Sequence, residues 1–157
     1  MVQMPQKKGR LSENPPEVLK LNRRISVLFR ERLDERLKPL GITAAQLQLL
    51  AALTKQPGTS GAHISRYCQV TPQTTHALLA AAENHGWIRR LPHPENARTL
   101  LATLTLEGQR VFTRGKAIVI KLQDRMLRSL TRAAVRQLEA TLAQLIENLE
   151  PHQKPKR

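Results

Sequence analysis

The segment from Thr71 to Ala77 carries side chains whose types and spacing could read the edges of DNA base pairs. Thr71 precedes Pro72, and a threonine N-cap followed by a proline at the first helical position is a preferred helix start. On that helix Gln73 can pair with adenine, Ala77 can touch a thymine methyl group, and Thr71 can donate to a phosphate. The candidate contacts on this helix are Thr71, Gln73, Thr74, His76 and Ala77.

This predicted reading helix contains no lysine or arginine, so contacts with phosphates must come from cations elsewhere in the chain. The candidates are Arg66, Arg89, Arg90 and Arg98. Arg98 falls at the tip of an expected hairpin, where a minor-groove or phosphate contact is favoured over an idle surface charge. For Arg89 and Arg90 a solvated strand end is the alternative.

The charge of the whole chain also indicates a polyanionic partner. Its 157 residues include 26 Lys and Arg against 12 Asp and Glu, a formal net charge of +14. Residues 1–40 hold 10 basic and 5 acidic side chains, residues 41–106 hold 5 and 2, and residues 107–157 hold 11 and 5. Because the excess is spread along the chain, nucleic acid is the leading partner and an acidic membrane surface the second. The longest apolar run is six residues, far below the ~20 needed to span a bilayer.

The residue types that support catalysis or metal binding are not arranged for either task. The five histidines have neither H-x-x-x-H nor H-x-x-H spacing, and none has a carboxylate at ligand spacing. No nucleophile-elbow pattern or glycine-rich phosphate loop occurs. The single cysteine, Cys68, cannot form an internal disulfide, and we expect a small core residue rather than a redox sensor. We therefore expect no enzyme, no metal and no other cofactor.

Three short helices and a hairpin are expected around the reading segment. The first helix starts at a capping box of Thr43 with Gln46, the second fits residues 60–68, and the third stops at Gly86. Two strand-like runs follow, on either side of a turn-rich stretch at 92–97. Helix-turn-helix followed by hairpin is the outline of a winged helix-turn-helix.

Long amphipathic helices flank this region and are expected to pair across a dimer. Residues 17–38 repeat apolar side chains at spacings of three to five. Thr105 and Thr131 can cap two further helices, the second with near-heptad apolar spacing. The expected interface residues are Leu21, Val135, Leu138, Leu142, Leu145 and Leu149.

The expected fold is therefore mainly α with a small β-hairpin wing. We place the winged helix-turn-helix at residues 41–105 and the dimerisation helices at 15–40 and 106–150. Residues 1–14 are expected to form a flexible basic arm, and residues 151–157 a basic tail.

In this order and spacing, the motifs resemble the MarR family of bacterial winged-helix regulators over about residues 18–150. The stretches that carry the resemblance are ITAAQ at 42–46, VTPQTT at 70–75, ENHGWIRR at 83–90, NAR at 96–98 and LTLEG at 104–108. The family's wing ends in D-x-R followed by L-T-x-x-G, and Arg98, Leu104, Thr105 and Gly108 match it. Asn96 stands where the family usually has aspartate, so it can accept a hydrogen bond from Arg98 but brings no charge.

The resemblance implies a homodimer that binds a near-palindromic operator and is often released from it by a small molecule. Relatives place a pocket for anionic aromatic molecules where the dimer helices meet the winged region, and Arg24, Arg30 and Arg110 fall near that junction in this chain. We expect a cytoplasmic, sequence-specific regulator that binds double-stranded DNA rather than a membrane and acts as a repressor. The alternative is a basic architectural protein that coats nucleic acid without sequence preference and without an effector.

Overall fold

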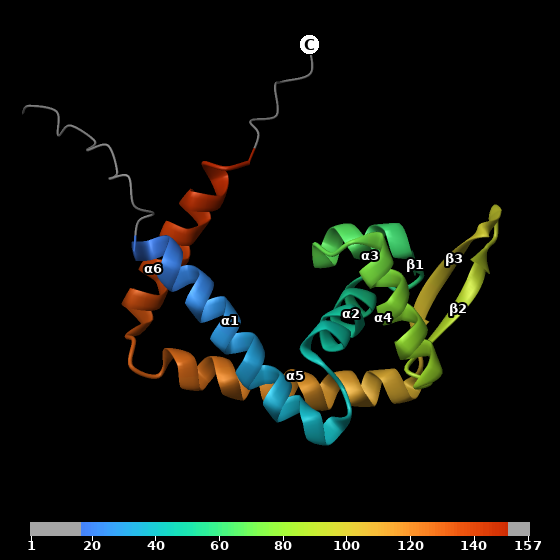
Figure 1. The fold of residues 1–157 in the computed structure, drawn as a ribbon, viewed down its shortest axis with the longest axis horizontal. Helices are drawn as coiled ribbons and strands as arrows, with labels where there is room; N and C mark the ends of the chain where they lie inside the picture. Colours follow the sequence, from blue (N-terminus) through green and yellow to red (C-terminus); the bar gives the residue numbers. More distant parts are fainter. Residues whose placement is uncertain (1–16, 151–157) are drawn as a thin grey trace, which may run out of the picture. The chain divides into compact units, whose positions relative to one another are not determined.

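The computed structural model describes residues 17–150 (Figure 1), and the chain divides into two compact units after Ile118. The arm expected over 1–14 and the tail expected over 151–157 lie outside the described residues. The first unit contains α1 (Glu17–Leu37), η1 (Lys38–Leu40), α2 (Ala44–Lys55), β1 (Thr59–Ser60), α3 (Gly61–Cys68), α4 (Pro72–Asn84), β2 (Ile88–His93), β3 (Asn96–Leu104) and the start of α5 (Leu106–Leu127). The second unit contains the rest of α5 and α6 (Arg132–Glu147).

The helix starts in the structure are set by the caps that the sequence predicts. The Thr43 N–H donates to Gln46 Oε1 at 2.9 Å, and the Gln46 N–H donates to Thr43 Oγ1 at 3.2 Å, so the capping box of α2 is confirmed. Thr71 and Thr131 likewise accept from backbone N–H groups at the starts of α4 and α6. The turn after α4 is made by Gly86, whose φ of +70° favours glycine.

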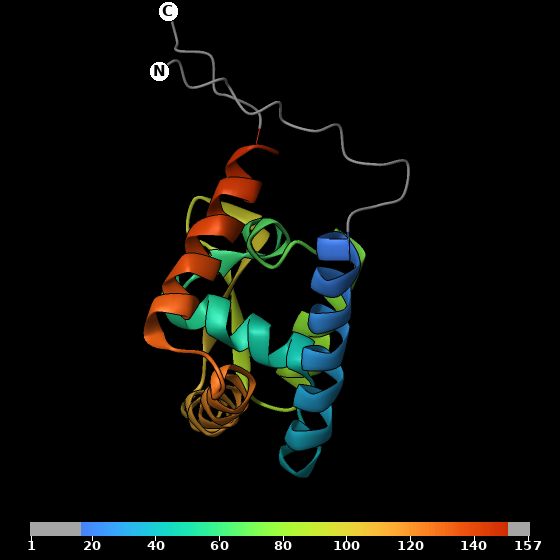
Figure 2. The ribbon, with the colours of Figure 1, turned by 90° about the vertical axis from the view of Figure 1, so that its left-hand side faces the viewer.

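α2 lies at the centre of the first unit. Its leucines Leu49, Leu50 and Leu53 are at most 1% exposed, and Ile64 of α3 is fully buried beside them. A helix with apolar residues over so wide an arc needs cover on several sides. That cover comes from α1, α3, α4 and β3, all of which contact α2, and Figure 2 shows α1 leading through η1 into it.

The wing is longer than the sequence predicts. The sequence predicts a turn-rich stretch at 92–97, but β2 and β3 extend through most of it and leave a two-residue turn at Pro94 and Glu95. The difference arises at Pro92, which the sequence analysis assigns to the turn. It stands in β2, which is an edge strand in the sheet order β1-β3-β2, and an edge strand tolerates proline because one side needs no donor.

A short third strand was missed by the sequence analysis. Thr59 and Ser60 form β1, which pairs antiparallel with Ala102 and Leu101 of β3. The fold class is nevertheless confirmed: the molecule is mainly α, with a winged helix-turn-helix. No helix in the described part of the chain is long and apolar enough to cross a membrane.

Candidate nucleic-acid interface

One face of α4 is free for contacts with a partner. Gln73, His76 and Ala77 are exposed, and their spacings of three and four place them on the same face of the helix. Thr75, Leu79 and Ala82 lie on the opposite face and are buried. The exposed residues Gln73, His76 and Ala77 are among the contacts that the sequence predicts on this helix.

The buried face of α4 is held against α3 by a hydrogen bond as well as by packing. The Ser65 hydroxyl of α3 lies 2.8 Å from the Thr75 hydroxyl, and both side chains are buried. Gly61 of α3 also lies against Leu79 of α4, where a Cβ would make a van der Waals contact at 3.4 Å with Leu79 Cδ1. The outward face of α4 is therefore presented by a helix whose inner face is bonded to α3.

Thr71 and Thr74 occupy the start of α4, and their hydroxyls are already engaged with each other. Thr71 Oγ1 accepts from the Thr74 N–H at 3.1 Å and lies 2.8 Å from Thr74 Oγ1. Both residues are exposed. A phosphate contact by Thr71 would therefore use the one hydroxyl proton that the capping bond leaves available.

Three of the four predicted phosphate contacts point away from the protein interior. Arg66 on α3, Arg89 on β2 and Arg98 on β3 are all exposed. Arg89 Nε donates to Thr103 Oγ1 on the neighbouring strand at 3.3 Å, which holds its side chain along the hairpin. Arg98 is the third residue of β3 and so follows the hairpin turn at Pro94 and Glu95 closely.

The wing tip contains a hydrogen bond between Asn96 and Arg98, but its donor is the backbone of Arg98 and not the guanidinium. Asn96 Oδ1 accepts from the backbone N–H of Arg98 at 3.2 Å. The amide oxygen of Asn96 therefore orders the backbone at the tip. The exposed guanidinium of Arg98 is left free to reach outward.

Arg90 differs from its neighbour Arg89 because it has a partner inside the protein. Its Nε donates to Glu83 Oε2 of α4 at 2.8 Å, and its Nη2 contacts the same oxygen. This hydrogen bond lowers the pKa of the Glu83 carboxyl. Sequence reasoning missed Glu83, because the pair spans the turn between a helix and a strand, where no fixed spacing marks a contact.

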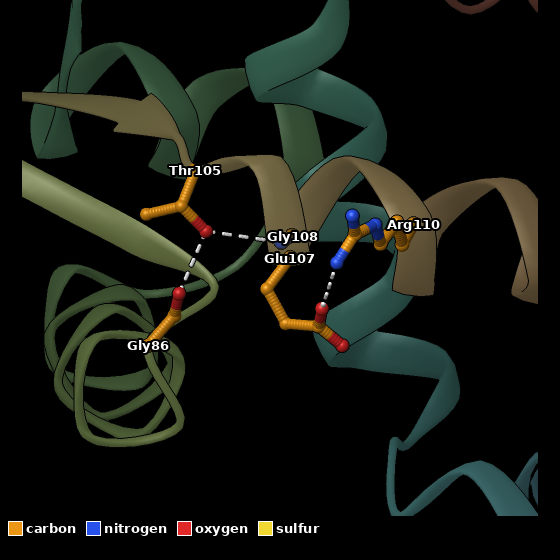
Figure 3. Close-up of polar contacts among 5 residues, drawn as sticks. All are labelled: Gly86, Thr105, Glu107, Gly108 and Arg110. Atoms are coloured by element: carbon orange, nitrogen blue, oxygen red, sulfur yellow. Dashed lines mark hydrogen bonds and ion pairs between the residues drawn. The ribbon is translucent and has the colours of Figure 1, made fainter.

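The base of the wing is tied to the end of α4 and to the start of α5 (Figure 3). The Thr105 hydroxyl donates to Gly86 O at 2.7 Å and accepts from the Gly108 N–H at 3.0 Å. The Thr105 N–H also donates to Trp87 O at 2.9 Å. A Cβ at Gly108 would lie only 1.9 Å from Trp87 O, so this L-T-x-x-G segment needs glycine for close backbone approach.

The chain is similar to known proteins in both sequence and fold. A family model described as "MarR family" matches residues 40–99. The chain is 32% identical over 122 residues to the HTH-type transcriptional repressor Rv2887 of Mycobacterium tuberculosis, an alignment that covers 78% of this chain and 88% of the relative. The chain belongs to the MarR family. This family consists of DNA-binding transcriptional regulators rather than enzymes.

Solved MarR-family structures share the fold. A mutant MarR from Escherichia coli complexed with operator DNA matches with a TM-score of 0.78 and 25% identity, over 87% of this chain and 99% of that chain. The Rv2887 MarR-family protein in complex with salicylic acid matches with a TM-score of 0.68 and 31% identity, over 86% of this chain and 99% of that chain.

The three arginines that the MarR resemblance implicates in effector binding are spread over two helices. Arg24 and Arg30 are exposed on α1, and Arg110 pairs with Glu107 on α5 at 3.4 Å (Figure 3). A hollow beside the end of α1 is lined by three carboxylates and one lysine: Glu31, Asp34, Glu35 and Lys38. Its charge disfavours an anion.

A second hollow lies in the other unit of this MarR-family chain, at the turn between α5 and α6. Arg128, Arg132 and Arg136 line it together with Asp124, and Leu127, Leu130 and Val135 supply apolar surface. Sequence reasoning did not single out these arginines. The i,i+4 spacing of Arg132 and Arg136 was the available signal.

The single cysteine lies in the protein interior. Cys68 is buried, and burial raises the pKa of its thiol, which keeps it protonated and weakly reactive.

Most of the expected dimer residues are exposed. Val135 is half-buried, and the others are exposed: Leu21, Leu138, Leu142, Leu145 and Leu149. Within residues 17–150, no three His, Cys, Asp or Glu side chains are grouped as metal ligands would be.

Proposed function

We propose that this chain is a homodimeric repressor that binds a near-palindromic operator and releases it when a small anionic aromatic molecule binds. The observation that carries the proposal is the outward face of α4, where Gln73, His76 and Ala77 are exposed on a helix whose other face is locked against α3. A helix presented in this way fits the major groove and reads base edges through its amide, imidazole and methyl groups.

In this proposal the phosphate contacts come from the elements around α4. Arg66, Arg89 and Arg98 supply charge from α3 and from the wing, and Thr71 supplies a hydroxyl at the start of the reading helix. Phosphate contacts fix the register of the protein on the duplex, while base contacts give sequence preference. Arg90 is not among these contacts, since its partner Glu83 lies within the protein.

The homodimer in this proposal is supported by the apolar surface of the flanking helices. Leu138, Leu142 and Leu145 recur along one face of α6, and each is between 39% and 45% exposed. A two-fold dimer places two copies of α4 side by side, so a pseudo-palindromic operator follows from the symmetry of the protein. Residues 15–40 and 106–150 form the proposed dimerisation region, and residues 41–105 the DNA-binding region.

The repressor and effector roles are supported by relatives. The 32% identical relative is named a repressor, and a solved structure of Rv2887 contains salicylic acid. Arg24, Arg30 and Arg110 are the proposed effector residues. The arginine-lined hollow at the turn between α5 and α6 is the competing place for an anionic molecule, because its charge fits better than that of the hollow beside α1.

Selection of bound sequences from a pool of random duplexes tests the proposal. The purified chain should enrich one pseudo-palindrome and bind it ~10³-fold or more tightly than random duplex at the same salt concentration. A protein that coats nucleic acid would instead enrich no sequence and show only a steep salt dependence, and that result would reject the proposal.

The effector is tested by melting temperature and operator affinity with millimolar salicylate. Salicylate should raise the melting temperature and weaken operator binding, and Arg24→Gln or Arg30→Gln should abolish both effects. If Arg132→Gln abolishes them instead, the effector binds at the turn between α5 and α6. No response from the unmutated chain would reject a salicylate-like effector.

A further inference from the structure

The two adjacent arginines of β2 point to different surroundings. Arg89 is exposed and bonds across the hairpin to Thr103, while Arg90 faces α4 and its side chain is only 20% exposed. Successive side chains of a strand point to opposite faces, so a single strand carries both orientations. The sequence alone predicts the same phosphate contact for both residues.

The geometry points to a clamp formed by Glu83 and Arg90 that fixes the wing relative to the reading helix, so Arg90 is a positioning residue for DNA binding and not a DNA contact. This inference rests on the proposed function for its binding measurements. The clamp joins the last turns of α4 to the middle of β2.

The contact between the two side chains has the properties of a specific bond. Two guanidinium nitrogens of Arg90 contact the same carboxylate oxygen of Glu83, and the Nε distance is 2.8 Å. Hydrogen bonds between charged groups are about twice as strong as neutral ones. The Glu83 side chain is 36% exposed, so the pair is only partly surrounded by water, and screening weakens it less than a fully exposed pair.

The clamp adds to two other attachments of the wing. One is the junction of Thr105 with Gly86 at the base of the hairpin (Figure 3), and the other is the pairing of β3 with β1. Neither of them joins β2 to α4. Arg90 lies on the edge strand β2, where it pairs with Ala102 of β3, so its bond to Glu83 restrains the strand that β1 does not contact.

The position of the wing matters because the proposed DNA contacts lie on separate elements. Gln73 and Ala77 are on α4, whereas Arg98 is near the tip of the wing. Operator binding needs base contacts and phosphate contacts at the same time, while binding to random duplex depends mainly on phosphates. Loosening the wing should therefore weaken operator binding more than binding to random duplex.

Two substitutions with the same loss of charge test the clamp. Arg90→Gln should lower the ratio of operator affinity to random-duplex affinity about tenfold, with an unchanged slope of log affinity against log salt. Arg89→Gln, the matched control, should lower both affinities together and leave the ratio unchanged. Glu83→Gln should reproduce the effect of Arg90→Gln. The double variant should be no worse than either single variant, because one bond is lost in all three.

A charge swap and a measurement without DNA complete the test. Glu83→Arg combined with Arg90→Glu should restore most of the affinity ratio, which a lost phosphate contact would not allow. NMR order parameters of the hairpin backbone should fall in Glu83→Gln and Arg90→Gln but not in Arg89→Gln. This measurement separates the two proposals. If the unmutated chain showed no operator preference, the proposed function would be rejected, but the order parameters of the hairpin would still test the clamp.

The inference is overturned by the opposite pattern in folded variants. If Arg90→Gln reduces the salt slope by ~1 while Glu83→Gln keeps the affinity ratio and the order parameters of the unmutated chain, Arg90 contacts a phosphate directly. Melting curves of every variant establish that each is folded at the temperature of the binding measurements.

Discussion

The winged region and α6 differ in how far their leucine side chains are buried. In the winged region Leu49, Leu50 and Leu53 are almost completely buried. In α6 no residue is buried, and Leu138, Leu142 and Leu145 keep about two fifths of their surface exposed. Both segments are rich in leucine, so composition does not explain the difference.

This difference indicates which apolar surface the chain leaves uncovered. The apolar side chains of α2 in the winged region are covered by α1, α3, α4 and β3, and within residues 17–150 every buried side-chain N or O atom has a hydrogen-bond partner. No residue of α6 is buried, although a helix in a protein takes most of its stability from tertiary packing of its apolar face. The comparison favours a second copy of the chain as the missing cover.

The largest effect is expected from a charge on the exposed face of α6. Leu142→Asp or Leu145→Asp should convert a dimer to a monomer or unfold the protein, because the interface would bury an unpaired carboxylate. Leu91→Asp is the control, because Leu91 on the wing is 55% exposed yet lies outside the proposed interface. Sedimentation should show a change of mass only for the α6 variants. A folded monomer for the unmutated chain at micromolar concentration would show that no second chain covers α6.

Inside the winged region, the next largest effect is expected at Gly108. Gly108→Ala places a Cβ within 1.9 Å of Trp87 O, which is backbone and cannot move aside without shifting the wing. We expect a loss of about 3 kcal/mol in the free energy of unfolding, measured with urea. Gln109→Ala, at the exposed next position, should change it by less than about 0.5 kcal/mol.

A smaller loss of stability is expected from the hydrogen bond between α3 and α4. Thr75→Val removes the hydroxyl that lies 2.8 Å from the buried Ser65 hydroxyl and should cost about 1–2 kcal/mol. Thr74→Val changes the same residue type at the neighbouring exposed position and should cost less. Equal losses in urea denaturation would show that burial does not distinguish the two faces of α4.

At the wing surface, effects should appear in DNA binding rather than in stability. Arg98→Ala should weaken binding to operator and random duplex alike and reduce the slope of log affinity against log salt by ~1. Its free energy of unfolding should stay unchanged, because the guanidinium is exposed. Unchanged affinity together with an unchanged slope would show that the wing tip does not touch DNA.

The smallest effect is expected at Asn96. Asn96→Asp restores the residue usual in the family and keeps an oxygen that can accept from the Arg98 N–H. The added negative charge orders the tip but opposes attraction to phosphate, so operator affinity should change by less than about 1 kcal/mol. A larger loss in filter binding or calorimetry would mean that the charge at the tip, rather than its geometry, controls binding.

Much of the fold was predictable because its signals are local. Caps such as Thr43 and Thr131 and the turn at Gly86 depend on a few neighbouring residues, and the structure confirms them. β1 was not predictable, because two residues become a strand only through pairing with β3. Pro92 likewise indicates a turn unless the edge position of its strand is known.

The candidate site was predictable in its faces but not in its internal bonds. The exposed set on α4 follows from helical spacing, whereas the partner of Arg90 follows from how the hairpin packs on α4. Arg89 and Arg90, for which the sequence predicts the same contact, thus have different surroundings in the fold.

The central claim is that the winged region presents the DNA-reading face, and that the flanking helices require two chains on each operator. The mass of the protein–DNA complex tests this claim most directly, measured on the selected palindrome and on a duplex carrying a single half-site. We expect two chains on the palindrome, and we expect no stable one-chain complex on the half-site at any protein concentration. A single chain bound to the half-site, with half the binding free energy of the palindrome, would contradict the account.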